Sequence, residues 1–194
     1  MSDSVFKEHP LTQFMRKQVA VADAGVHITL EPFLQHFNLR GDPAGDFGRI
    51  VQKATGQSLP EVGRVSRGAH SVYWLGPDEF LLVSDSNVAD SLVAGLASTH
   101  HGCTNLGGGQ MRMTVSGPHA RDFLSKASTL DFDAGSFRVD DCAQSTFAKA
   151  GALFALRDDT PLFELVVRRS FLDYAAQWMA HAGQEFGIVF RDPA

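Results

Sequence analysis

The chain has 194 residues, and its 22 acidic and 17 basic side chains give a formal net charge of −5 at pH 7. This acidic balance argues against a nucleic-acid-binding protein, which needs clustered Lys and Arg to neutralise phosphates. Hydrophobic residues make up 44% of the chain and charged residues 20%. The composition is therefore that of a globular protein with its own core, and it excludes a disordered or fibrous chain.

The start of the sequence lacks the basic residues, the apolar stretch and the small-residue cleavage site of a secretory signal. The longest clearly apolar run, near residues 150–156, is far shorter than the roughly 20 residues that cross a bilayer. We therefore expect a cytoplasmic protein with no membrane partner. In a reducing compartment Cys103 and Cys142 are expected to be free thiols, although two cysteines by number also permit one disulfide.

Residues 1–25 are polar and interrupted by Pro10 and Gly25, which predicts an N-terminal arm with one short helix at residues 12–20. Such an arm needs a surface to lie on and often belongs to an interface. Residues 26–194 are expected to form a single domain.

From residue 26 onward, short strands alternate with single helices. The strongest hairpin signal places two strands, at residues 71–75 and 79–83, around the turn Gly76-Pro77-Asp78. The other elements are predicted as strands at 26–30 and 35–39, a helix from 43 or 44 to 54 ended by Gly56, a polar connector at 59–68, a helix after Asn87, a turn-rich loop at 100–109, a strand at 111–115, a helix after Pro118, a hairpin at 143–156, a strand at 162–167, a helix at 170–182 and a strand at 185–190. This order predicts an α+β fold with mixed or antiparallel sheets and helices packed on one face.

The helix at residues 170–182 has the clearest pattern, with Ser170 as a good N-cap and Gly183 as a good stop. Its apolar residues recur at helical spacing, so most of them are expected to form the core of the domain. They are Phe171, Tyr174, Ala175, Trp178, Met179 and Ala182.

No constellation of residues predicts catalysis. The run at residues 107–109 is Gly-Gly-Gly followed by a strand, whereas a phosphate-binding loop needs glycines followed by a helix. His100, His101 and Cys103 are zinc-ligand types, but their spacing matches no known zinc motif, and a surface turn explains them better. We therefore predict no catalytic, cofactor-binding or metal-binding residue in this chain.

Arg168 and Arg169 lie where an apolar strand meets the 170–182 helix. Guanidinium groups at such a place suit a partner's carboxylate or a phosphate. The competing interpretation is an ordinary solvated strand end.

Four segments resemble the gamma subunit of heterotetrameric sarcosine oxidase, and the resemblance runs from about residue 25 to the C-terminus. They are WLGPDEFLLV at 74–83, VSGPHARDFL at 115–124, AQSTFAKAGALF at 143–154 and FELVVRRSFLDYAAQW at 163–178. The family is similar in fold to the aminomethyltransferase (glycine-cleavage T-protein) superfamily and its folate-binding domain. This chain is far shorter than a full aminomethyltransferase.

The resemblance implies a small gamma subunit in an alpha-beta-gamma-delta complex. Such a complex oxidatively demethylates sarcosine to glycine, with hydrogen peroxide and either formaldehyde or 5,10-methylenetetrahydrofolate as further products. The resemblance also implies that FAD, FMN, NAD, zinc and tetrahydrofolate belong to the partner subunits. This chain is then expected to hold no cofactor and to be noncatalytic on its own, with Trp74, Arg168 and Arg169 as candidate interface residues.

Other functions stay open at this point. One is a free-standing folate-binding or aminomethyltransferase-like protein, in which Arg168 or Arg169 binds a folate tail and Tyr73 or Trp74 stacks on a pterin. Another is the gamma subunit of a related N-methyl amino acid oxidase or dehydrogenase. A small zinc protein is the third.

Overall fold

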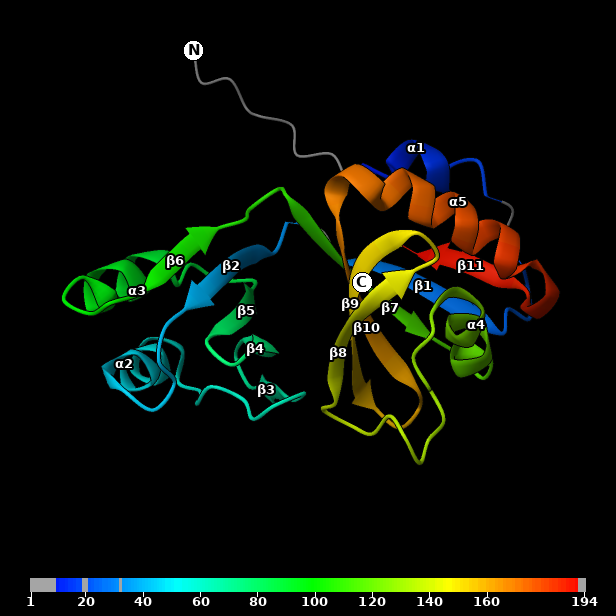
Figure 1. Cartoon of the computed structure of the whole chain (residues 1–194). Coiled ribbons are helices and arrows are strands. Elements are labelled where there is room, and N and C mark those ends of the chain that lie inside the picture. The colour runs from blue at the N-terminus through cyan, green and yellow to red at the C-terminus, as the bar shows by residue number, and fades with distance from the viewer. Residues whose placement is uncertain (1–9, 19–20, 32, 192–194) are drawn as a thin grey trace, which may run out of the picture.

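Two β-sheets pack against each other through their inner faces, and helices cover the outer face of each sheet (Figure 1). The computed structural model describes residues 10–18, 21–31 and 33–191. The predicted α+β class with mixed and antiparallel sheets is confirmed. No helix in these described ranges has the length and hydropathy needed to cross a membrane.

The first sheet contains β1 (Val26–Glu31), β7 (Gln110–Ser116), β8 (Cys142–Phe147), β9 (Ala150–Asp158), β10 (Leu162–Arg168) and β11 (Ile188–Arg191). Its strand order is β11-β1-β7-β10-β9-β8. β1 runs parallel to β11, and the other neighbours are antiparallel. We call it the six-stranded sheet.

The second sheet contains β2 (Gln35–Arg40), β3 (Val65–Arg67), β4 (Ser71–Gly76), β5 (Glu79–Ser84) and β6 (Gly102–Asn105). This five-stranded sheet is antiparallel throughout, in the order β3-β4-β5-β2-β6. The predicted hairpin of β4 and β5 is confirmed.

The helices are α1 (Thr12–Met15), α2 (Asp46–Thr55), α3 (Ala89–Leu96), α4 (Ala120–Ala127) and α5 (Leu172–Ala182), with 3-10 turns η1 (Arg169–Phe171) and η2 (Gln184–Phe186). One core cluster joins α4 and α5 to the six-stranded sheet. A second joins α2 and α3 to the five-stranded sheet. A third, smaller cluster lies between the two sheets. The central strands of the six-stranded sheet are therefore buried on both faces, which explains their nearly continuous apolar sequences.

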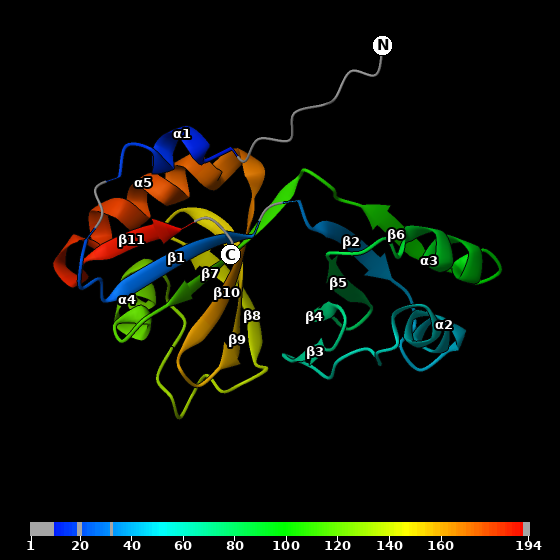
Figure 2. The same cartoon turned by 180° about the vertical axis from the view of Figure 1, so that it is seen from behind.

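The described part of the N-terminal arm packs on the six-stranded side of the molecule, where α1 lies beside α5 and β11 (Figure 2). Leu11 is 1% exposed, and the ring of Phe14 meets that of Phe190 edge-on at 5.1 Å. This segment thus finds its surface within its own chain. The predicted helix at residues 12–20 is only Thr12–Met15, and residues 19–20 lie outside the described part.

Three sequence predictions about elements are wrong. The connector at 59–68 and the loop at 100–109 contain β3 and β6, which are short edge strands with too few apolar residues to give a clear alternation. The closing strand begins later than predicted, because η2 and Gly187, with φ of 64°, precede β11.

The start of α5 also differs from the prediction. Ser170 lies in η1, and Phe171 occupies the N-cap position without a side-chain capping bond. Phe171, in the 3-10 turn, is 42% exposed, and Tyr174, at the edge of the buried face of α5, is 37% exposed. Leu172 and Ala176 are buried in their place. Trp178 is half-buried and packs against the core, as predicted.

Candidate functional site

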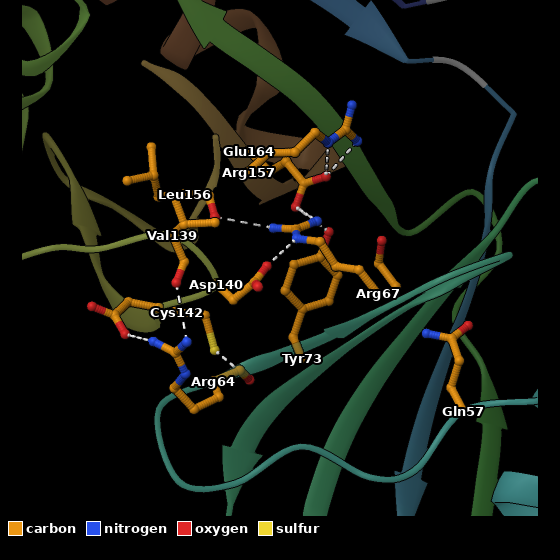
Figure 3. Close-up of polar contacts among 12 residues, drawn as sticks. Gln57, Arg64, Arg67, Tyr73, Val139, Asp140, Cys142, Leu156, Arg157 and Glu164 are labelled. Atoms are coloured by element: carbon orange, nitrogen blue, oxygen red, sulfur yellow. Dashed lines mark hydrogen bonds and ion pairs between the residues drawn. The ribbon is translucent and has the colours of Figure 1, made fainter. Parts of the chain in front are cut away.

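The most distinctive site in the described chain is a group of charged side chains between the two sheets. We call it the inter-sheet cluster, and it consists of Glu31, Arg67, Tyr73, Arg112, Asp140, Arg157 and Glu164. Figure 3 shows Arg67, Tyr73, Asp140, Arg157 and Glu164. Glu164 is its centre and is 0% exposed.

Glu164 lies on β10 and points toward the five-stranded sheet. Its Oε2 accepts hydrogen bonds from Arg67 Nη1 at 2.8 Å and from the Tyr73 hydroxyl at 2.7 Å. Its Oε1 accepts one from Arg157 Nε at 3.0 Å. Burial by itself tends to raise the pKa of Glu164, but the surrounding guanidinium groups outweigh burial and lower the pKa below its ordinary value. The carboxylate is thus ionised and multiply bonded in the interior.

Arg67 links the two sheets directly. It belongs to β3 of the five-stranded sheet, yet besides Glu164 it donates from Nε to Asp140 Oδ1 at 2.8 Å (Figure 3). A second connection lies beside it, where Arg64 pairs with Asp141 and donates from Nη2 to the Val139 carbonyl at 3.1 Å. These contacts join segments 73 to 97 residues apart in the chain. The two sheets are therefore fixed to each other by directional bonds as well as by apolar packing.

Arg112 approaches Glu164 from β7 of the same sheet. Its Nη1 lies 3.5 Å from Glu164 Oε1 and donates to the Tyr73 hydroxyl oxygen at 3.2 Å, while its Nε pairs with Glu31. Burial raises the pKa of Tyr73 well above its ordinary value, and the Glu164 charge raises it further. Tyr73 therefore stays protonated and acts as a hydrogen-bond donor to Glu164.

The charges of the cluster balance. Three arginines, Arg67, Arg112 and Arg157, face three carboxylates, and each arginine has at least one ion-pair partner within 4 Å. A buried network with its donors and acceptors paired internally fixes geometry. This arrangement holds the two sheets together. It does not suit Glu164 as a general base, because the carboxylate of a general base must be free to take a proton.

A cavity of about 500 Å³ adjoins the cluster and is lined in part by Arg112, Arg157, His70 and Ser84. His70 and Ser84 resemble a catalytic pair, since Ser84 Oγ lies 2.9 Å from His70 Nδ1. However, Ser84 Oγ donates its proton to the Ser86 carbonyl at 2.8 Å. The Ser86 carbonyl thus competes with the imidazole for the hydroxyl proton, which does not favour Ser84 as an activated nucleophile.

The three candidate interface residues, Trp74, Arg168 and Arg169, lie in different surroundings. Trp74 is half-buried and packs against two of the core clusters of its own chain. Arg168 is exposed at the end of β10 and lines a second cavity, of about 310 Å³. Arg169 begins η1, its backbone N–H donates to the Gly109 carbonyl at 3.0 Å, and its guanidinium lies near Gly108.

The cysteines and the candidate zinc ligands do not gather into one site. His100 and His101 line a third cavity beside Arg40, whereas Cys103 lies on β6 and packs against the second core cluster. Over the described ranges, no group of three or more His, Cys, Asp or Glu side chains is arranged to hold a metal ion. Both cysteines are free thiols, and burial raises the pKa of Cys142 to about 11.

The inter-sheet cluster was not predicted from the sequence. Its signal was a single Glu164 inside the apolar run at residues 162–167 and Arg112 inside the run at 111–115. A lone charge in the middle of a buried strand indicates a paired interior charge, because unpaired ones are almost never fully buried.

Known proteins similar to this chain agree with one another. The model of the "Sarcosine oxidase, gamma subunit family" matches residues 40–185. The sarcosine oxidase gamma subunit of Corynebacterium sp. (strain U-96) is 29% identical over 162 residues, which is 81% of this chain and 78% of that protein. The gamma subunit from Arthrobacter sp. is 29% identical over 159 residues, 79% of this chain and 78% of that protein.

Solved structures show the same likeness. A chain of heterotetrameric sarcosine oxidase from Corynebacterium sp. U-96 superposes with a TM-score of 0.82 and 26% identity, over 91% of this chain and 92% of that one. The glycine cleavage system aminomethyltransferase T from Bartonella henselae has a TM-score of 0.61 at 13% identity, over 86% of this chain and 48% of that one. The second likeness is one of fold.

Proposed function

The chain belongs to the sarcosine oxidase gamma subunit family, and from this we propose that it is the gamma subunit of a heterotetrameric sarcosine oxidase. In such a complex, sarcosine is oxidatively demethylated to glycine, with hydrogen peroxide and either formaldehyde or 5,10-methylenetetrahydrofolate as further products. We place this complex in the cytoplasm. The support is the likeness, over most of both chains, to a chain of a heterotetrameric sarcosine oxidase.

In this proposal the gamma subunit is a noncatalytic assembly subunit. FAD, FMN, NAD, zinc and tetrahydrofolate then belong to the alpha, beta and delta subunits. The observation that carries this role is the inter-sheet cluster, because its charges are paired with one another and fix the two sheets in one relative position. A rigid body with prearranged surfaces is what a subunit needs to hold larger partners, since less ordering is then required on binding.

The test is co-expression of all four subunits with an affinity tag on this chain. We expect the tag to recover flavin-containing partners in a fixed ratio, together with sarcosine-dependent formation of hydrogen peroxide. Purified alone, the chain should show no flavin absorbance and no turnover of sarcosine. The proposal fails if the other three subunits form an active complex that does not retain this chain, or if the isolated chain oxidises sarcosine.

A further inference from the structure

The cavity beside Arg168 lies where the inner faces of the two sheets meet, and both sheets contribute to its wall. Leu75 and Leu81 come from the five-stranded sheet, and Leu153 and Val166 from the six-stranded sheet. Its polar lining includes Arg168 and the amides of Gln110 and Gln144.

Strand register explains why Arg168 faces this cavity. Side chains two residues apart on a strand share a face, so Glu164, Val166 and Arg168 of β10 all point toward the other sheet. Arg168 is opposite Gln110 of β7, as Val166 is opposite Arg112. The same face thus holds a buried carboxylate at its centre and an arginine at its end.

The two ends of this face differ in charge pairing. Each arginine of the inter-sheet cluster has a carboxylate partner, whereas the Arg168 side chain has no ion pair or hydrogen bond with any described residue. No Asp or Glu lines the cavity. The site is therefore locally cationic in a chain whose net charge is −5, and an anionic group complements it.

The two amide side chains of the wall are less available to an incoming group than Arg168. The Oε1 atom of Gln110 is buried and has no hydrogen-bond partner in the described part of the chain. The amide nitrogen of Gln144, by contrast, donates to the Leu75 carbonyl at 2.9 Å. The exposed guanidinium of Arg168 is therefore a polar group of the wall that an incoming acidic side chain can reach, and it suits a carboxylate.

The rim of the cavity extends the apolar surface. Phe171, which lines the cavity, is 42% exposed, and Tyr174 on the next turn is 37% exposed. Partly exposed aromatic residues beside an arginine are typical of protein interfaces. This rim offers contact area beyond the cavity, which a small ligand does not need, so it favours a protein segment as the occupant.

We propose that this cavity receives an Asp or Glu side chain from a loop of a partner subunit. The carboxylate of that residue binds Arg168, and the neighbouring loop residues pack on Phe171. The inference rests on the proposed function, because it presumes that partner subunits exist, and it goes further by naming the site and the chemistry of the contact.

Of the two arginines that the sequence offered as interface residues, only Arg168 lines this cavity, so Arg169 serves as its matched control. Both arginines are exposed. In the co-expressed complex, Arg168→Ala should weaken association with the partner subunits by at least about 30-fold, the lower range for truncating one member of a buried ion pair. Arg169→Ala should stay within about twofold of wild type, and both isolated variants should melt at the wild-type temperature.

A cavity-filling variant tests the site without changing its charge. Gly151 lines the cavity, and a Cβ added there meets no atom within 4 Å. Gly151→Ala should therefore assemble as wild type, whereas Gly151→Phe, once its isolated chain is shown to melt as a folded protein, should block the partner loop. Normal assembly of both Arg168→Ala and Gly151→Phe would overturn the inference while leaving the gamma-subunit function intact.

Other occupants give different results. If the isolated wild-type chain binds N-acetylaspartate in calorimetry and Arg168→Ala abolishes that binding while assembly is normal, the cavity is a site for small acids and our proposal is wrong. It is also wrong if Arg168→Ala only dissolves a dimer of this chain in sedimentation. If the wild-type chain fails to bind any partner subunit, the proposed function itself fails.

Discussion

Replacing Glu164 by Gln removes the central charge of the inter-sheet cluster while keeping the size of the side chain. Glu164 is 0% exposed, and the neutral amide leaves a cluster with three positive and two negative side chains. Arg67 keeps Asp140, but Arg112 and Arg157 must share Glu31. Removing one partner of a buried ion pair costs about 3 to 5 kcal/mol of unfolding free energy.

That loss is large compared with the roughly 5 to 15 kcal/mol stability of a typical domain. For a chain of this size, a loss of about 1 kcal/mol in unfolding free energy lowers Tm by about 2 to 4 °C, so the Tm of Glu164→Gln should fall by about 6 to 20 °C. The assay is thermal and urea unfolding of the isolated chain at pH 7. Glu185→Gln is the matched control, because Glu185 forms an ion pair with Lys126 at the surface, and such pairs contribute about 0 to 1 kcal/mol.

The acid dependence of stability gives an independent check on the same group. Because the pKa of Glu164 is lower in the folded than in the unfolded chain, its stabilising contribution is complete above the ordinary Glu pKa and disappears as pH falls through the folded value. Glu164→Gln should flatten this acid limb. If Glu164→Gln loses no more stability than Glu185→Gln, the cluster does not stabilise the contact between the sheets and our reasoning is wrong.

Three further predictions concern buried or half-buried side chains. Burial lowers the pKa of His36 to about 4, so between that pH and about 6.5 the imidazole is protonated in the unfolded chain but not in the folded one. We therefore expect His36 to make the protein about 2 kcal/mol less stable at pH 5 than at pH 7. In urea unfolding, His36→Gln should remove that difference. Cys142 is 4% exposed, and its pKa is raised to about 11. A thiol reagent at pH 8 should therefore modify Cys103 in the native protein and Cys142 only after denaturation, and the Cys103→Ser variant identifies the reactive thiol. Rapid labelling of Cys142 in the native protein would contradict its burial. Trp178 packs against Phe123 and Phe147, and Trp178→Ala should lower the unfolding free energy by about 3 kcal/mol, measured against the exposed Val93→Ala as control.

The central hairpin shows how far local sequence goes. Residues 71–75 and 79–83 carry apolar side chains on both faces with a Gly-Pro-Asp turn between them, and this pattern alone indicates two paired strands. β4 and β5 confirm it. The end of α2 is another case, because Gly56 has a φ of 74° that favours glycine at a helix end.

Local patterns fail where neighbouring elements decide the structure. β3 and β6 become strands because longer strands pair with them, although their own residues are too polar to predict it. Most of the apolar stripe predicted for α5 does reach the core, but Phe171 lies in the preceding 3-10 turn and Tyr174 at the edge of the buried face, and both are exposed.

The sequence determined most of the strands and helices and the likeness to one family, because alternation, capping and motif residues act over a few positions. Tertiary structure alone decided that Arg67 meets Glu164 across 97 residues of chain. It also decided that Arg168, on the same face of the same strand, is left without a carboxylate partner among the described residues. Both outcomes follow from strand register and from which face of one sheet lies against the other, and those are set only when the whole chain folds.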